Sequence, residues 1–153
     1  MLIAVLTGCG HPADGTRASA SPSATAGVPG RATVRGPGVG MDITSAVAHL
    51  DASGNGSLTM SVRSEEPVPD HLDFVATPDS GRGQLVGAAH GTGGTLQSAG
   101  ILIPAGGTVL FGPAGPRVDL TRVRGVTARH TLPVSLEFGV AGLVRLDAVV
   151  RGD

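Results

Sequence analysis

The sequence predicts an all-β Greek-key sandwich of about eight strands, and three observations support this prediction. The chain contains 25 glycines and 11 prolines, a composition that favours many turns and few long helices. Aromatic residues make up only 2% of the chain, so its core must be built mainly from aliphatic side chains. Short segments of alternating apolar and polar residues recur at intervals of roughly 8–12 residues, as in β-sandwiches.

A length of 153 residues suits one domain with a tail. Residues 1–9 read as a truncated lipoprotein signal, and residues 10–40 as a disordered Ala/Ser/Pro/Gly spacer that buries too little surface to fold. Residues 41–153 carry the strand pattern and are predicted to form the β-sandwich domain.

The only cysteine, Cys9, ends the tetrapeptide Leu-Thr-Gly-Cys, which fits a bacterial lipobox in which the cysteine is acylated. The apolar run before it is short and has no basic residue, so either the true start codon lies upstream or the match is accidental. We expect the former, because a spacer follows. One cysteine also excludes an internal disulfide. The expectation is an extracytoplasmic protein held on the bacterial cell membrane by a lipid on Cys9.

The first half of the predicted domain contains four strand-like segments. A turn of the Asn-Gly kind, typical of hairpins, separates the first two of them. Each of the four is short and rich in aliphatic residues. The predicted strands are 43–50, 57–63, 71–77 and 84–89.

The second half is organised around residues 101–120, which read as a strand, an Ala-Gly-Gly turn, a second strand, and a Gly/Pro loop leading into a third. In that third strand, Val118 and Leu120 alternate with Arg117 and Asp119, so one face is apolar and the other polar. Two further alternating segments, 131–138 and 143–150, close the predicted fold around a four-residue hairpin.

Several of these segments resemble the periplasmic copper(I) chaperone family, PCuAC, whose members are extracytoplasmic cupredoxin-like β-proteins. Residues 103–109, Ile-Pro-Ala-Gly-Gly-Thr-Val, match the family phrase without a gap, and residues 113–115 stand in place of its Pro-Gly-Gly. The last two strands also resemble the family's ending. The resemblance covers roughly residues 56–150 and implies a cupredoxin-like sandwich that delivers copper(I) to a respiratory oxidase.

The resemblance also implies a copper(I) site made of a His, a Met about eleven residues later, and a His-x-Met pair on one strand. These four positions fall near Leu85, near Leu96, and on Arg117 and Asp119, and none of them holds His or Met. Arginine has no lone pair to donate, and a carboxylate is a hard ligand poorly suited to copper(I). Arg117 and Asp119 are instead expected to form an ion pair, and the metal ligands are judged to be largely lost.

His90, in a Gly-rich segment, is a weak candidate ligand, and with Asp119 it would supply only two donors. No nucleophile elbow or phosphate loop occurs, and the adjacent Glu65 and Glu66 precede two prolines and read as a solvated turn. No catalytic residue is therefore assigned, and the protein is not expected to be an enzyme. A net charge of −1 gives no reason to expect a nucleic-acid partner.

Two functions remain open. The first is a membrane-tethered lipoprotein resembling copper(I) chaperones, with copper(I) implied by the resemblance only. The second is a binding or assembly module of the cell envelope that uses the same scaffold without metal, with a protein partner.

Overall fold

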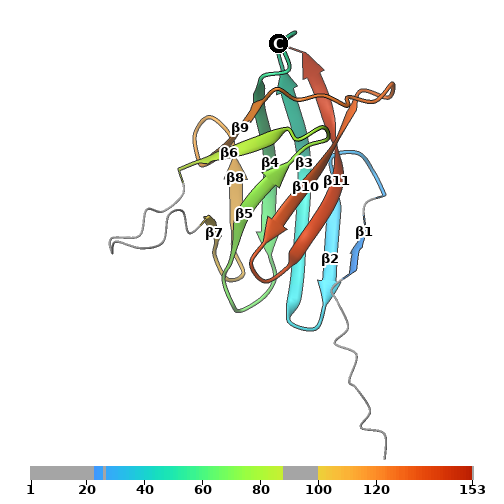
Figure 1. Cartoon of the computed structure of the whole chain (residues 1–153). Coiled ribbons are helices and arrows are strands. Elements are labelled where there is room, and N and C mark those ends of the chain that lie inside the picture. Colours follow the sequence, from blue (N-terminus) through green and yellow to red (C-terminus); the bar gives the residue numbers. More distant parts are fainter. Residues whose placement is uncertain (1–22, 26, 88–99, 153) are drawn as a thin grey trace, which may run out of the picture.

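The computed structural model describes residues 23–25, 27–87 and 100–152, and it places eleven strands in them (Figure 1). No helix in this part of the chain is long and apolar enough to cross a membrane. The prediction of an all-β fold is confirmed. The strands are β1 (Ser23–Thr25), β2 (Ala32–Gly36), β3 (Val39–Leu50), β4 (Gly56–Ser64), β5 (Asp70–Ala76), β6 (Arg82–Val86), β7 (Ile101–Ile103), β8 (Thr108–Phe111), β9 (Arg117–Thr121), β10 (Thr131–Phe138) and β11 (Gly142–Gly152).

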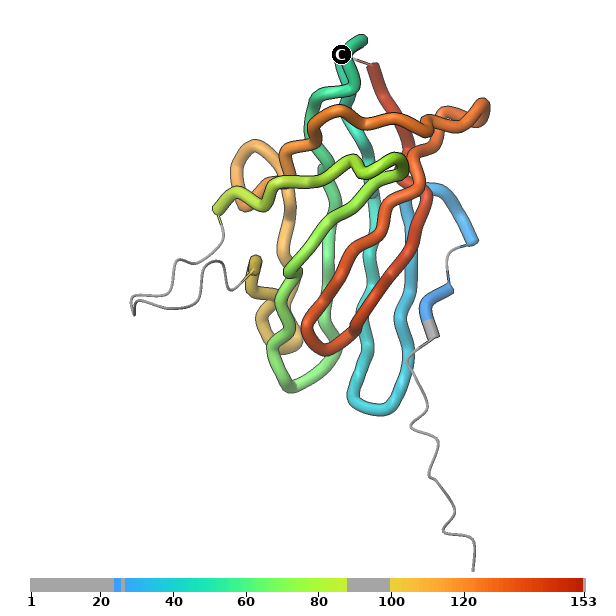
Figure 2. Tube along the Cα trace, in the orientation of Figure 1, coloured from blue at the N-terminus to red at the C-terminus, as the bar shows by residue number. Residues whose placement is uncertain are grey.

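Seven of these strands close into a barrel, because the pairing order β3-β11-β10-β5-β6-β9-β4 ends with β4 pairing back to β3. Only the β11–β3 pair is parallel, and all the other pairs are antiparallel. The tube in Figure 2 shows the strands wrapping around a common interior. The remaining strands extend the barrel wall: β8 pairs with β4, β7 with β5, β2 with β3, and β1 with β2.

β3 takes part in two separate pairings along one side. Its first half pairs with β2 and its second half with β11, and its register with β4 shifts between Thr44 and Val47. Ser45, within this bulge, has φ +55°, a left-handed conformation that a bulged residue can adopt. The bulge lets one twelve-residue strand serve both the barrel and the β2 extension.

The core lies inside the barrel and is aliphatic, as the composition predicts. Val118 and Leu120 of β9 are buried, and the four apolar side chains that alternate along β10 are buried with them. Met60 of β4 is buried as well. Sequence alternation therefore located the inner face of these strands correctly.

The folded region begins earlier than the predicted boundary at residue 41. β1 and β2 lie within the segment 10–40 that was predicted to be a disordered spacer, and Ala32 and Val34 of β2 are buried. Amino-acid composition did not predict these strands, because β2 contributes only these two side chains to the core. Pairing with β3 stabilises β2.

Three of the site predictions fall on residues outside the described part of the chain, namely Cys9, His90 and Leu96.

Candidate functional site

Two of the copper-ligand positions implied by the resemblance, Arg117 and Asp119, lie on β9. This strand runs between β6 and β4, and its start is set by a closed loop in which the Gly112 N–H donates to the Pro116 carbonyl at 2.9 Å. Because Val118 and Leu120 point into the barrel, Arg117 and Asp119 point outward from the same strand. The polar face that the sequence predicts therefore exists on the outside of the barrel.

Arg117 and Asp119 form the ion pair that their spacing predicts. The Arg117 Nε lies 3.2 Å from Asp119 Oδ1 and 3.4 Å from Oδ2. Their side chains are 51% and 38% exposed, so water screens the attraction and its contribution to stability is at most about 1 kcal/mol. The pair occupies the two positions where the resemblance places His and Met.

The register of β6 places Leu85 on the other face of the sheet. Asp119 pairs with Gln84, whereas Leu85 pairs with Val118, and paired residues in neighbouring strands share a face. Leu85 is accordingly half-buried against the core. A ligand at residue 85 itself could not meet Arg117 and Asp119, whereas its neighbours Gln84 and Val86 lie beside them on the outer face.

The outer face carries few metal donors around Asp119. Cross-strand pairing aligns His49, Ser57, Asp119 and Gln84 in one row over β3, β4, β9 and β6. His49 Nε2 lies 3.4 Å from the Thr59 hydroxyl. Within residues 23–25, 27–87 and 100–152, no three His, Cys, Asp or Glu side chains are grouped so that they could hold a metal ion.

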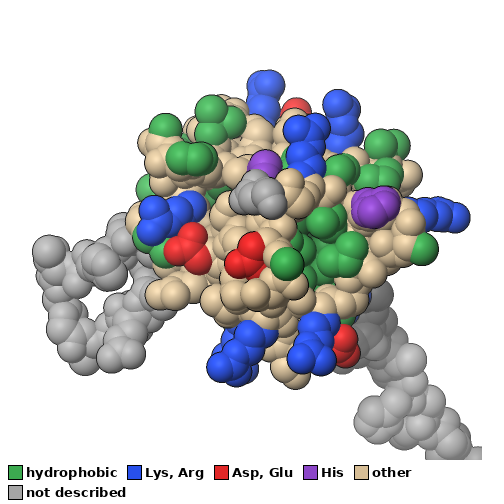
Figure 3. Space-filling view, turned by 90° about the horizontal axis from the view of Figure 1, so that it is seen from above, with side chains coloured by type: hydrophobic (Ala, Val, Ile, Leu, Met, Phe, Trp, Pro, Cys, Tyr) green, Lys and Arg blue, Asp and Glu red, His purple; other side chains and the backbone are tan. Residues whose placement is uncertain are grey.

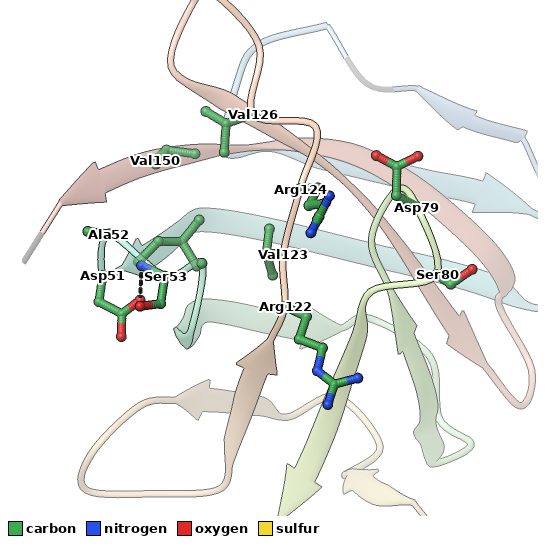
Figure 4. Close-up of a pocket in the computed structure, with 12 residues that line it drawn as sticks. Asp51, Ala52, Ser53, Asp79, Ser80, Arg122, Val123, Arg124, Val126 and Val150 are labelled. Atoms are coloured by element: carbon green, nitrogen blue, oxygen red, sulfur yellow. Dashed lines mark hydrogen bonds between the residues drawn. The ribbon is translucent and has the colours of Figure 1, made fainter.

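A second candidate site is a groove of about 790 Å³ at one end of the barrel (Figure 4). It lies between the β3–β4 turn, the β5–β6 turn and the connection that follows β9. Its floor includes Val123 and Val150, and its rim carries Arg122 and Arg124. Neither arginine stands in a recognisable sequence motif.

No protein-family profile matches the chain, and no curated protein sequence matches it. Among solved structures, the copper-bound PCuAC domain from PmoF2 is similar at 25% identity and a TM-score of 0.59, covering 74% of this chain and 93% of that domain. The apo PCuAC domain from PmoF1 is similar at 22% identity and a TM-score of 0.61, covering 74% of this chain and 94% of that domain.

The apo PCuAC domain of PmoF2 is similar at 23% identity and a TM-score of 0.55, covering 73% of this chain and 90% of that domain. Sequence identities in this range establish the architecture, whereas function depends on the site residues. All three similarities span nearly the whole length of the known domains. The barrel of this chain therefore has a PCuAC-like, cupredoxin-like fold.

Proposed function

We propose that the protein is a membrane-tethered, extracytoplasmic lipoprotein of the copper-chaperone type in which the copper(I) ligands have largely been lost. The ion pair between Arg117 and Asp119 carries this proposal, since it stands where the resemblance places a His-x-Met pair. The guanidinium offers no lone pair, and its positive charge repels a cation. The remaining carboxylate is a hard oxygen donor, whereas copper(I) prefers thioether, thiolate and imidazole groups.

A second candidate function is a binding or assembly module of the cell envelope that uses no metal. The groove at the barrel end favours this alternative, because it combines apolar floor residues with guanidinium groups on its rim. Both functions use the same scaffold and neither requires catalysis. The first retains at most residual copper(I) binding, whereas the second involves no metal.

Copper(I) titration in the presence of a competing chelator, bicinchoninate, tests whether the copper(I) site has been lost. We expect the full-length protein to show no stoichiometric binding tighter than about 1 μM. Stoichiometric binding tighter than this, abolished by His90→Ala and retained in the matched variant His130→Ala, would mean that His90 recruits copper(I), and the proposal of a lost site would be wrong.

The tether has its own test. Expressed in bacterial cells with an intact export signal, the protein should incorporate radiolabelled palmitate and partition with membranes, and Cys9→Ser should abolish both. A matched Ser19→Ala variant in the same segment should behave like the unaltered protein. Palmitate labelling that persists in Cys9→Ser would show that Cys9 is not the lipid attachment site.

A further inference from the structure

The groove at the barrel end is built from segments that are distant in sequence. The β3–β4 turn, the β5–β6 turn and residues 122–126 surround it, and apolar side chains of Leu50, Val123 and Val150 lie at its base. A second hollow of about 430 Å³, which includes Asn55, Arg82 and Thr121, shares Ser80 and Arg122 with the groove. The two hollows together offer an elongated surface rather than a closed cavity.

Three arginine side chains on this surface have no ion-pair partner among the described residues. In the described ranges, no carboxylate forms an ion pair with Arg122 or Arg124. Arg82 extends over the Phe74 ring, with its guanidinium carbon 5.9 Å from the ring centroid. Three guanidinium groups, those of residues 82, 122 and 124, therefore border the two hollows without a carboxylate partner among the described residues.

The two acidic residues of the groove do not pair with these arginines. Asp51 folds its carboxylate back into its own turn, where Oδ1 accepts the N–H groups of Ser53 at 2.8 Å and Asn55 at 2.9 Å. Figure 4 shows the Asp79 carboxylate directed away from Arg124. Seen from this end of the barrel, apolar side chains lie on a face that also carries several arginines (Figure 3).

The backbone around the groove is held in an uncommon conformation. Asp79, Ser80 and Arg122 have φ values of 56°, 65° and 55°, in the left-handed region that side-chain-bearing residues seldom adopt. The N–H of Arg122 donates to Asn55 Oδ1 at 3.1 Å, and that of Val123 donates to the Gly54 carbonyl at 2.8 Å. Such conformations persist only where surrounding contacts fix them, and they concentrate at binding sites.

The groove also lies at the end of the barrel away from the point where the N-terminal segment joins it. Ser23 pairs with Arg35, beside the β2–β3 hairpin, whereas Leu50 and Val150 lie at the far ends of β3 and β11 (Figure 1). If the chain is anchored through Cys9, the tether reaches the hairpin end of the barrel. This arrangement favours a protein partner over the lipid surface as the occupant of the groove.

We propose that this groove binds an extended acidic segment of a partner protein. Carboxylates of the segment would pair with Arg122 and Arg124, and an apolar side chain between them would pack on Val123, Val126 and Val150. Arginine suits this role because its planar fork binds a carboxylate with two hydrogen bonds. The inference rests on the proposed function as a binding module and involves no copper, so a copper titration neither supports nor contradicts it.

The test uses a fluorescein-labelled peptide of alternating glutamate and leucine, with the corresponding glutamine–leucine peptide as its neutral partner. Fluorescence anisotropy measures affinity for the full-length protein, and amide chemical shifts in NMR spectra locate the peptide. We expect the acidic peptide to bind with shifts concentrated in residues 50–54, 79–82 and 121–126. Arg122→Asn/Arg124→Gln should weaken it by about tenfold or more, and raised salt should weaken it further.

The matched control is Arg31→Gln/Arg145→Gln, which removes the same charge from exposed positions outside the groove and should leave affinity unchanged. Asparagine at residue 122 tolerates the left-handed backbone, and unchanged amide shifts elsewhere would verify that the groove variant is folded. The proposal would be overturned if the glutamine peptide bound as tightly as the acidic one, or if both double variants lost the same affinity. It would also be overturned if the peptide changed amide shifts mainly outside the groove. Binding of phosphatidylglycerol vesicles through Arg122 and Arg124 without peptide binding would overturn it as well.

Discussion

The carboxylate of Asp70 holds the backbone of Val140, seventy residues away, through a hydrogen bond of 2.8 Å from the Val140 N–H to Oδ1. The Ala141 N–H donates to Oδ2 at 2.9 Å, and the His71 N–H donates to Oδ1 at 2.7 Å. Asp70 is only 4% exposed, so these three donors replace the water that an ionised carboxylate would otherwise require. The first residue of β5 thereby fixes the hairpin between β10 and β11.

Asp70→Ala should destabilise the protein by about 3 kcal/mol, because it removes the acceptor and leaves N–H groups of residues 71, 140 and 141 without their partner. Urea unfolding followed by circular dichroism measures this loss. Asp147→Ala, on the exposed face of β11, is the control and should change the free energy of unfolding by less than about 0.5 kcal/mol. Equal effects of the two substitutions would show that Asp70 does not secure the hairpin.

Restoring soft donors on β9 should create copper(I) affinity. In Arg117→His/Asp119→Met, imidazole and thioether groups would stand two residues apart on one strand and therefore on one face. We expect copper(I) to bind at least about tenfold more tightly than to the unaltered protein, as measured by competition with bicinchoninate.

The control for this graft removes the ion pair without adding donors. Arg117→Gln/Asp119→Asn should show no gain in copper(I) affinity, because neither amide is a soft ligand. If both double variants gained affinity equally, the repulsion by Arg117 and not the missing donors would explain weak binding. If neither gained, the outer face of β9 would not be a usable metal position in this barrel.

Asp42 makes the β2–β3 pairing sensitive to acid. Burial by itself would raise the pKa of Asp42, but hydrogen bonds from Arg35 and Thr33, together with the positive charges of Arg35 and Arg63, outweigh it and lower that pKa below its ordinary value of 3.8. A lowered pKa in the folded state stabilises the protein above the ordinary value, and this stabilisation disappears as the pH falls through the folded-state pKa.

Asp42→Asn should therefore lower the melting temperature at pH 7, and the difference from the unaltered protein should shrink as the pH falls below 3.8. Thermal unfolding over a series of pH values measures this. Asp147→Asn removes one carboxylate from an exposed position on β11 and should leave the melting temperature nearly unchanged over the same range. A difference for Asp42→Asn that stayed constant into acid would contradict a role for its ionisation.

The alternation of apolar and polar residues predicted most strands and the buried side of each. In residues 131–138, for example, the inward-facing positions follow a period of two. It could not show the closure of the barrel, because the return pairing of β4 with β3 and β9 depends on three-dimensional register. The same limit applies to the first ligand position. Counting from the family phrase gave a position near Leu85 on β6, and only the Leu85–Val118 pairing shows that residue 85 itself lies on the inner face.

The place of Arg122 and Arg124 in the groove could not be predicted from the sequence, for a different reason. Arg122 and Arg124 gain significance from the loops that fold around them, and the left-handed backbone at Asp79 and Arg122 has no reliable signature in residue types other than Gly and Asn. The ion pair of Arg117 and Asp119, in contrast, followed from strand geometry alone, because residues i and i+2 share a face.

Gly56 marks the point where the barrel closes, because it pairs with Leu50 of β3 on one side and with Leu120 of β9 on the other. A Cβ atom at this position would overlap the carbonyl oxygen of His49, a backbone atom that cannot move without shifting β3. Gly56→Ala should therefore destabilise the protein by about 3 kcal/mol in urea unfolding.

Gly112→Ala is the matched control for Gly56→Ala, since the nearest atom to its Cβ would be Thr59 Cγ2 at 3.9 Å, an ordinary contact. It should change the free energy of unfolding by less than about 1 kcal/mol, and it could raise it by restricting the unfolded chain. If Gly56→Ala were as mild as this control, β3 and β4 would have room to separate at residue 56. The closure of the barrel would then not depend on their close approach.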